Sequence, residues 1–378
     1  MSQKESIKKP FWAIWMFYLF IAFEIIYMIS PFGIYYYSVY GKGLNFLNDH
    51  SITAWLSSFF LPHIVETSSM LLNLYKDIGW ILAMIGFVGF LIGAGQIYYY
   101  KFAQKGAVTG GIYNMIRHPQ YASLAMGSFG LLLAWPRYLV LIVFITMLFV
   151  YYFLTRIEEN ECEEKFGQSY TEYRNRTPMF LPFTVPLTEK LLHLPRSGIK
   201  RYLAILALYS LAIVGAIGGA NGLKSYSVGK LYSLYSFNSA TISVAEIERD
   251  TLKKVMEIAL SEREVQKRLE AVKGGSEAKF LNYVLPFEWY FSDIPMNIPE
   301  GMHGHHHPDH YNTNLYKIIF TQAELKTHRR VEGKALILNT VKRYPIVEVT
   351  VDVSQHRATT VENPPANVRW GDIPTPLF

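Results

Sequence analysis

The chain contains little cysteine and little charge. Cys162 is the single cysteine among 378 residues, so no intramolecular disulfide can form. Charged residues make up 17% of the sequence, compared with about 25% in typical soluble domains. The net charge of +6 is not gathered in a basic run interleaved with aromatic residues, which argues against a nucleic-acid partner. Internal repeats and long low-complexity segments are also missing, which argues against a repeat architecture.

Apolar residues are abundant where charge is scarce. They make up 51% of the chain, and the runs within the first 223 residues approach the roughly 20 residues that cross a bilayer. Because the first run has no small-residue cleavage site, it is expected to remain as a membrane helix. The third run is short, so a tilted or partly inserted hairpin with the fourth is expected. The five predicted spans are 11–29, 78–98, 121–135, 138–154 and 202–223.

The segment "ITAWLSSFFLPHIV" (52–65) is also apolar, but it is short and contains Pro62 and His63. It is interpreted as an interfacial helix rather than a sixth span. Five spans place three basic groups on one side of the membrane, which is the cytoplasmic side by the positive-inside rule. These groups are Lys4, Lys8 and Lys9; Lys101, Lys105 and Arg117; and the basic residues of 156–201.

This topology predicts a cytoplasmic N-terminus and an extracytoplasmic segment 224–378, in the inner membrane if the source is prokaryotic. Within that segment, 244–272 has the three- and four-residue apolar spacing of an amphipathic helix. The β-branched runs 315–322, 334–341 and 344–353 predict strands.

The expected fold is therefore an all-α multi-pass membrane domain with about five transmembrane helices, followed by a small α+β extramembrane domain. The predicted divisions are an N-terminal helix with the interfacial segment, a membrane core with a cytoplasmic segment, a last membrane helix, and the α+β domain. Their ranges are 1–77, 78–201, 202–223 and 224–378.

Polar residues stand at several predicted membrane exits. "GIYNMIRHPQY" (111–121) carries Arg117 and His118 before the third span, and Glu158 and Glu159 follow the fourth. Charged groups at membrane depth usually have partners or a functional role, and together these could bind a zwitterionic ligand. Each has a structural alternative: a snorkelling anchor for the Arg-His pair and a solvated helix face for the glutamates.

Glycines lie late in the second span, in "GFVGFLIGAGQ" (86–96). Gly93 and Gly95 could admit a flat ligand to the backbone, or they could serve ordinary helix packing. Tyr98, Tyr99 and Tyr100 follow, either as cation–π partners of a cationic ligand or as an interfacial aromatic belt.

The order of these elements resembles the integral-membrane methyltransferases that include isoprenylcysteine carboxyl methyltransferase and the phosphatidylethanolamine N-methyltransferases. The resemblance rests on G-x-Y-x-x-x-R-H-P-x-Y, an apolar hairpin, E-E, F-G-x-x-Y-x-x-Y and a proline, over roughly 78–183. It implies S-adenosylmethionine as the methyl donor and a lipid, lipid-modified or small apolar acceptor. The sequence departs from many members at Ser123, where they carry glycine.

The resemblance also implies which residues form the site. Arg117 and Glu159 are the implied catalytic residues. The implied cofactor-binding residues are Gly93, Gly95, Arg117, His118, Pro119, Tyr121, Glu158, Glu159, Tyr170 and Tyr173, with Pro178 in the segment that closes over the cofactor.

A histidine-rich loop, "EGMHGHHHPDHY" (300–311), lies in the C-terminal segment. Dense imidazoles can ligate zinc, copper or nickel, although the spacing lacks a specific zinc motif and an exposed polar loop is the alternative. The candidate ligands are His303, His305, His306, His307 and His310. This segment also supports a second hypothesis, in which a methyltransferase-like scaffold contacts protein partners through 224–378 in a larger membrane complex.

Overall fold

The computed structural model describes residues 52–103, 106–182, 198–302, 304–326 and 331–365, and the isolated residues 15, 16, 19, 47 and 50. The first predicted span and the tail beyond 365 lie almost entirely outside these residues. The chain divides into two compact units, each described by itself. The membrane unit comprises Met1–Gly33, Tyr75–Trp135 and Leu139–Ile217, and the sheet unit comprises Ile34–Leu74, Pro136–Tyr138 and Gly218–Phe378.

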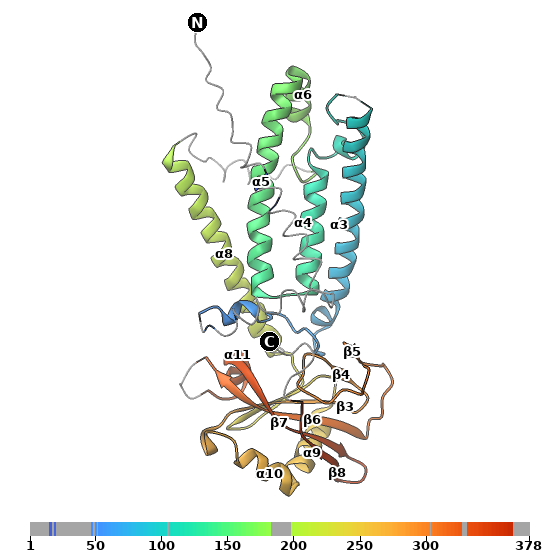
Figure 1. The fold of residues 1–378 in the computed structure, drawn as a ribbon, viewed down its shortest axis with the longest axis vertical. Coiled ribbons are helices and arrows are strands. Elements are labelled where there is room, and N and C mark those ends of the chain that lie inside the picture. Colours follow the sequence, from blue (N-terminus) through green and yellow to red (C-terminus); the bar gives the residue numbers. More distant parts are fainter. Residues whose placement is uncertain are drawn as a thin grey trace. The chain divides into compact units, whose positions relative to one another are not determined.

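Long apolar helices dominate the membrane unit (Figure 1). Within the described residues, three are long and apolar enough to span a membrane: Met70–Tyr100, Tyr138–Phe166 and Ile199–Val228. The predicted count of five is therefore not confirmed. The third predicted span is a helix of 16 residues, as its shortness suggested. The helices are α3 (Met70–Phe102), α4 (Pro119–Ala134), α5 (Tyr138–Phe166), α6 (Gln168–Arg176) and α8 (Ile199–Val228), with a 3-10 turn η3 (Gly111–Asn114) before α4.

Glycines let α3 and α4 approach closely. A Cβ atom on Gly79 would lie 2.7 Å from the carbonyl oxygen of Gly130, and one on Gly86 would collide with the backbone of Gly127. Small residues allow such backbone contact between membrane helices. On its other side, α4 packs on α5 through a buried cluster centred on Tyr121 and Met147. The three helices therefore form a close-packed group that fixes the positions of the residues at their ends.

The segment 52–65 corrects one prediction. It forms a single 3-10 turn, η2 (Ala54–Ser57), rather than an interfacial helix. The backbone is instead bonded to the turn before α5: Phe59 forms a β-bridge with Arg137, and the Phe60 amide donates to the Pro136 carbonyl at 2.9 Å. Pro62 also lacks the amide that a continuing helix would need.

The sheet unit contains a six-stranded sheet in the order β1-β2-β3-β6-β7-β8. Neighbouring strands are antiparallel, except that β2 and β3 are parallel and are connected through α9 and α10. A separate two-stranded ribbon pairs β4 with β5. The strands are β1 (Ser233–Tyr235), β2 (Ser239–Ser243), β3 (Phe280–Pro286), β4 (Tyr290–Phe291), β5 (His305–His306), β6 (Leu315–Leu325), β7 (Thr340–Asp352) and β8 (Arg357–Glu362).

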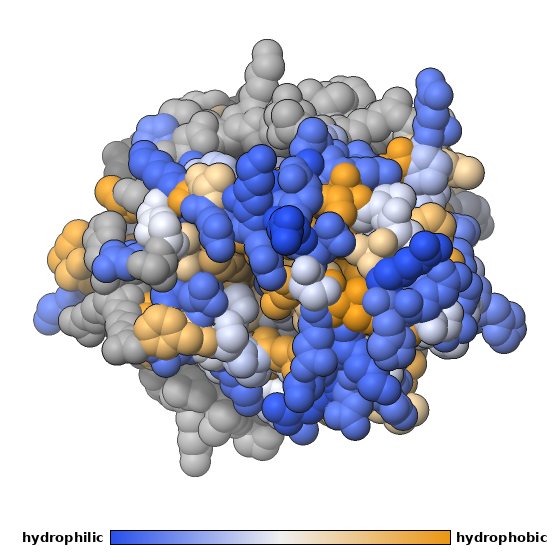
Figure 2. Space-filling view, turned by 90° about the horizontal axis from the view of Figure 1, so that it is seen from below, coloured by the Kyte–Doolittle hydropathy of each residue, from blue (hydrophilic) through white to orange (hydrophobic). Residues whose placement is uncertain are grey.

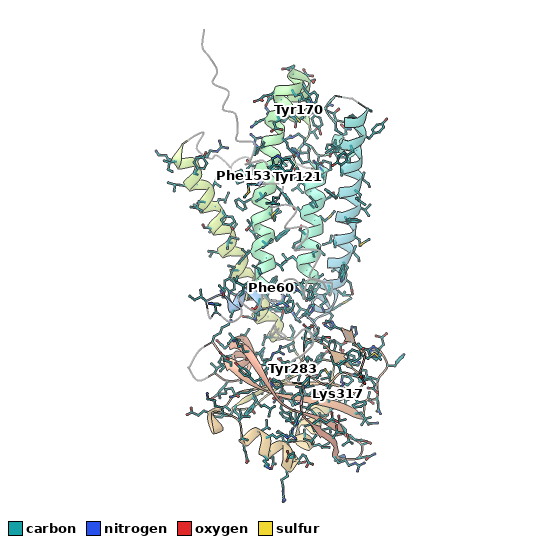
Figure 3. The ribbon with its side chains drawn as sticks, in the orientation of Figure 1. Phe60, Tyr121, Phe153, Tyr170, Tyr283 and Lys317 are labelled. Atoms are coloured by element: carbon teal, nitrogen blue, oxygen red, sulfur yellow. The ribbon has the colours of Figure 1, made fainter. Side chains whose placement is uncertain are left out.

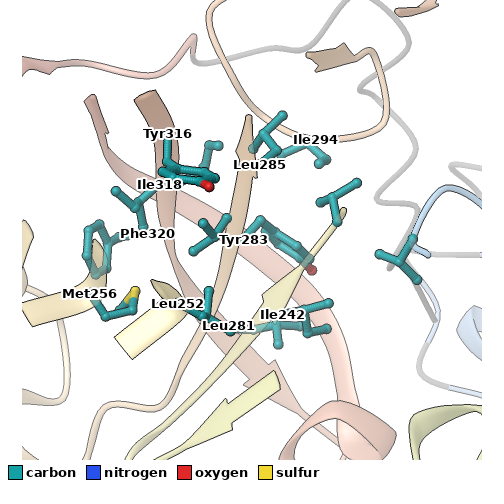
Figure 4. Packing of buried hydrophobic residues seen from close by; sticks show 14 of the residues in the cluster. Ile242, Leu252, Met256, Leu281, Tyr283, Leu285, Ile294, Tyr316, Ile318 and Phe320 are labelled. Atoms are coloured by element: carbon teal, nitrogen blue, oxygen red, sulfur yellow. The ribbon is translucent and has the colours of Figure 1, made fainter. Parts of the chain in front are cut away.

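Apolar residues of the sheet and of α9 form the core of this unit. Leu252 and Met256 of α9 pack with strand residues such as Leu281 and Phe320 (Figure 4). The face seen from the side of α10 and β8 is mostly hydrophilic (Figure 2). A buried apolar core under a hydrophilic surface is typical of a domain in contact with water.

Two sequence predictions in this unit need correction. The expected helix over 244–272 is divided into α9 (Arg249–Ser261) and α10 (Arg263–Glu270) by the extended residue Glu262. The expected strand 334–341 is mostly α11 (Lys334–Asn339). Gly333, with a φ of 59°, reverses the chain immediately before α11, and the apolar run that follows fits a short helix as well as a strand. The predicted strands at 315–322 and 344–353 are confirmed as β6 and β7.

Candidate functional site

A cavity of about 560 Å³ lies in the membrane unit, where α3 ends, α4 begins and α5 gives way to α6. Tyr121 and Tyr170 lie toward this end of the helices (Figure 3). Aromatic, basic and acidic side chains share the wall with small residues of the 106–108 segment. The lining residues are Ile97, Tyr100, Gly106, Ala107, Val108, Tyr113, Arg117, His118, Gln120, Glu158, Cys162, Lys165, Phe166, Tyr170 and Tyr173.

A buried ion pair supports one side of the cavity. The Nε of Arg117 lies 2.7 Å from Oε1 of Glu159, whose side chain is fully buried. Arg156 approaches the other carboxylate oxygen at 3.1 Å. Burying an ion costs several kcal/mol unless partners compensate, so Glu159 depends on these cations.

His118 links the paired glutamates. Its Nε2 lies 3.2 Å from Oε1 of Glu159, and its Nδ1 lies 3.8 Å from Oε2 of Glu158. Tyr121 donates a hydrogen bond from its hydroxyl to Glu158 at 2.6 Å. Glu158, at the cavity wall, is thus held by α4, while Glu159 lies behind Arg117 and His118 and does not line the cavity.

Backbone hydrogen bonds join the Arg-His-Pro element to the segment after α6. The amide of Arg117 donates to the Pro178 carbonyl at 2.9 Å, and that of His118 donates to the Met179 carbonyl at 3.1 Å. The Arg117 guanidinium also donates to the carbonyls of Arg174 and Thr177. Pro119 follows as the first residue of α4, a position where its missing amide costs nothing. The predicted closing segment, around Pro178, therefore contacts the motif directly.

Buried tyrosines form another part of the wall. The Tyr113 hydroxyl donates to the side-chain oxygen of Gln120 and lies 3.3 Å from the Gly93 carbonyl oxygen, and the Tyr173 hydroxyl donates to the Tyr113 carbonyl at 2.6 Å. Burial raises the pKa of Tyr173 to about 12, and it raises the pKa of Tyr113 and Tyr170 as well. These phenols stay neutral at physiological pH and present rings and hydroxyl groups to the cavity.

The predicted site residues divide into three groups. Those that line the cavity are Arg117, His118, Glu158, Tyr170 and Tyr173. Glu159, Tyr121, Pro119 and Gly93 adjoin these residues without lining it. Gly95 has open space around its Cβ position, so the structure gives it no close neighbour.

Sequence reasoning missed several lining residues on α5. Cys162, Lys165 and Phe166 follow Glu158 at four, seven and eight residues, which is one face of a helix. That spacing could have identified them once Glu158 was chosen. Among the three consecutive tyrosines considered earlier, Tyr100 lines the cavity, whereas Tyr98 and Tyr99 are exposed.

The histidine-rich loop lies in the sheet unit, and its described part does not gather its histidines at one point. His305 forms an ion pair with Asp293 at 2.7 Å, while His306 stacks on Tyr290 and His307 on Phe291. Burial alone would raise the pKa of Asp293, but its hydrogen bond to His305 and nearby positive charge hold that pKa below its usual range. His310 is exposed, and His303 lies outside the described residues.

The cavity combines features suited to a small ligand that carries both signs of charge. Arg117 and Lys165 can attract a carboxylate, and Glu158 can attract a cation. Tyrosine rings can contact a cationic or flat aromatic group. Its volume also falls within the roughly 300–1,000 Å³ that is usual for small-molecule sites.

Comparison with known proteins identifies this same region. No curated protein and no solved structure matched the chain. Residues 78–169, which contain α4, most of α3, all of α5 and the paired glutamates, match the model of the phospholipid methyltransferase family, the family whose motifs the sequence resembles.

Proposed function

We propose that this protein is an S-adenosylmethionine-dependent methyltransferase that acts on a membrane lipid or another apolar acceptor. The observation that carries the proposal is the buried Glu159, paired with Arg117 and His118 directly behind the wall of the cavity. The family match to a membrane methyltransferase and the apolar helices support the same reading.

The residues at the wall fit S-adenosylmethionine by their chemistry. Arg117 and Lys165 would hold its carboxylate, Glu158 its ammonium group, and the tyrosine rings its sulfonium and adenine. When bound, the cofactor supplies a methyl group on a positively charged sulfur. The chain would contribute by orienting the acceptor and excluding water, since a displacement of this kind gains much of its rate from positioning.

The two glutamates take different roles in this proposal. Glu158 is exposed to the cavity and would contact the ligand. Glu159 is completely buried and would act through Arg117 and His118, by fixing where their charges lie. Glu159 is therefore a positioning residue, although the sequence alone suggested a catalytic one.

The acceptor would reach the site from the bilayer. The helices that could span the membrane carry large exposed apolar side chains, including Ile81, Met84 and Leu206, which are suited to lipid contact. The distribution of basic residues would place the cavity at the cytoplasmic surface and segment 224–378 outside.

Titration of S-adenosylmethionine into purified protein tests the proposal. Wild-type protein should show saturable binding, and Glu158→Gln should weaken it by about tenfold or more, since loss of a desolvated charge contact typically costs about 2–5 kcal/mol. Glu164→Gln, an exposed glutamate on the same helix that does not line the cavity, is the matched control and should bind normally. Absence of measurable wild-type binding would favour the scaffold hypothesis.

Cysteine labelling tests the proposed topology. With Cys162 replaced by serine, a single cysteine at the exposed position Glu164 and one at the exposed position His310 should be labelled from opposite sides of the membrane. Labelling of both from one side would refute the topology and leave the cofactor proposal to the titration.

A further inference from the structure

A second polar cluster lies wholly within the sheet unit. His63, Asp293 and His305 each offer one potential metal-binding atom, and these atoms lie within 4.8 Å of one another. It is the one such group of three among the residues that the structure describes. The side chain of Asp293 is 7% exposed, His63 is equally enclosed at 6%, and the His305 side chain is 33% exposed.

The β4–β5 ribbon positions two members of this cluster. Phe291 pairs with His305 across the ribbon. Just beyond that pair, the amide and the hydroxyl of Ser292 both donate to the Gly304 carbonyl, and the Gly304 amide donates to the Ser292 hydroxyl. Gly304 has a φ of 80°, a conformation that favours glycine. These bonds fix the backbone around Asp293 and His305. The Oδ2 atom of Asp293 and the Nε2 atom of His305 lie 2.7 Å apart.

A stack of rings positions the third member. His63 lies flat against Phe59, with ring centroids 4.5 Å apart and an interplanar angle of 6°. The guanidinium of Arg137 lies over the Phe59 ring at 4.2 Å and donates to the Ser57 carbonyl. The imidazole of His63 also meets that of His305 edge-on, with centroids 5.8 Å apart. Its ring is therefore held in place before any ligand arrives.

We propose that His63, Asp293 and His305 form a binding site for a divalent transition metal of the zinc class. Two imidazoles and one carboxylate are a suitable donor set for such ions, with the fourth position left for water. Tetrahedral ligands at zinc distances of about 2.0–2.2 Å lie roughly 3.3 Å apart. The Asp293 and His305 atoms, 2.7 Å apart, are closer than that value, and all three potential ligand atoms lie within 4.8 Å of one another, so only small side-chain shifts would be needed to enclose an ion.

The site would join two stretches that are far apart in the sequence. His63 belongs to the segment before α3, whereas Asp293 and His305 belong to the β4–β5 ribbon. A metal bound to all three would therefore cross-link the segment to the ribbon. Since the unfolded chain does not hold these groups together, bound metal would stabilise the folded unit.

This ligand set differs from the histidine-rich loop as a whole. The rings of His306 and His307 are stacked on Tyr290 and Phe291 and have no place in the group. His306 is adjacent to His305 on the same short strand, so it provides a matched control for an imidazole that the structure does not assign to the metal.

Zinc titration of the full-length protein in detergent, after removal of metal with a chelator, tests the proposal. The wild-type protein should bind one zinc ion per chain and melt at a higher temperature when zinc is present. His63→Phe keeps a flat ring against Phe59 but removes the ligand atom. It and His305→Ala should each lose at least about tenfold in zinc affinity, while His306→Ala should bind zinc like the wild type.

Three outcomes would overturn the site. The wild type could bind no stoichiometric zinc, which would leave the cluster as an ion pair with a neighbouring imidazole. His306→Ala could weaken binding as much as His305→Ala, which would assign any metal to the exposed loop. Zinc could also raise the melting temperature of His63→Phe as much as that of the wild type, which would exclude His63 as a ligand.

Discussion

Each unit combines a buried carboxylate with a histidine and an arginine, but the surroundings of the two groups differ. In the membrane unit, Glu159 is paired with Arg117 and His118 beside a cavity of about 560 Å³. In the sheet unit, Asp293 is paired with His305, and Arg137 acts on it electrostatically. The potential ligand atoms of the second cluster, His63, Asp293 and His305, already lie within 4.8 Å of one another. This spacing suits a single ion.

The comparison shows that the free volume beside a buried carboxylate determines the size of the ligand that its charge can help to bind. Where a cavity adjoins the ion pair, the charges can be directed at a molecule of many atoms, and the carboxylate behind them serves to position them. Where imidazoles enclose the carboxylate, the same charge suits a single cation. The following predictions test this distinction, from the largest expected effect to the smallest.

Replacing Glu159 should have the largest effect on stability. Glu159→Gln leaves Arg117 without its buried countercharge, which typically costs about 3–5 kcal/mol. Thermal unfolding in detergent should show this loss, and Glu164→Gln on the exposed face of the same helix should change little. A Glu159→Gln protein as stable as the wild type would mean that the pair is not buried as described.

Replacing Arg137, whose charge acts on Asp293 of the second cluster, should lower stability and raise metal affinity. Arg137→Met loses a hydrogen bond to the Ser57 carbonyl and a cation–π contact with Phe59, at a cost of about 2–3 kcal/mol. It also removes a positive charge that acts on Asp293, so zinc affinity should rise severalfold. A fall in zinc affinity, measured by competition with a chelator, would contradict the proposed arrangement.

Removing a hydrogen bond to Glu158 while keeping its charge should have an intermediate effect on stability and on cofactor affinity. Tyr121→Phe deletes the 2.6 Å hydrogen bond to Glu158, and bonds to charged groups contribute about 1.5–3 kcal/mol. Because Glu158 is partly exposed, we expect the lower end of that range for stability. Cofactor affinity should fall less than in Glu158→Gln. Equal losses in the two variants would show that the carboxylate contributes to binding only while the Tyr121 hydroxyl holds it.

Glu348 in the sheet unit should make the stability of the protein depend on pH. Burial raises the pKa of Glu348 above its usual value, against the opposing effects of the hydrogen bond from the Asn297 amide, at 2.6 Å, and of the Lys317 charge. The folded state therefore holds this proton more tightly than the unfolded state does. The contribution of Glu348 to stability thus falls as pH rises from the unfolded pKa, about 4.3, through the folded pKa.

Glu348→Gln removes this dependence and keeps an acceptor oxygen for Asn297. Relative to the wild type, its free energy of unfolding should increase between pH 4 and pH 7, by about 1 kcal/mol or less. Urea unfolding at several pH values would measure the difference. A Glu348→Gln protein that loses stability toward neutral pH would show that the ionised carboxylate is a net stabilising partner.

The long apolar helices and two of the long strands were predictable because their patterns are local. The apolar runs gave α3, α5 and α8, and the β-branched runs gave β6 and β7. The strand expected at 334–341 is a helix because a short apolar run fits both structures and Gly333 turns the chain. The strand β3 was missed because all seven of its residues are buried and show no alternation.

The grouping of the motif residues was also predictable, but not the position of each one relative to the cavity. The motif predicted that Arg117, His118, Glu158 and Glu159 lie near one another, and the structure brings them together. Only packing showed that one glutamate faces the cavity and the other lies behind it, because adjacent helix positions differ by about 100° in direction.

The sequence by itself determined three helices long and apolar enough to span a membrane, the motif residues and the family they resemble, since each depends on residue type and spacing along one stretch of chain. Only the tertiary structure showed which glutamate lines the cavity and which histidine of the loop lies beside other potential metal ligands. It also brought in His63, which no spacing could connect with Asp293 and His305. Contacts between distant segments form only when β-bridges, ring stacks and strand pairs bring those segments together in the folded chain. The spacing of residues along the sequence does not contain that information.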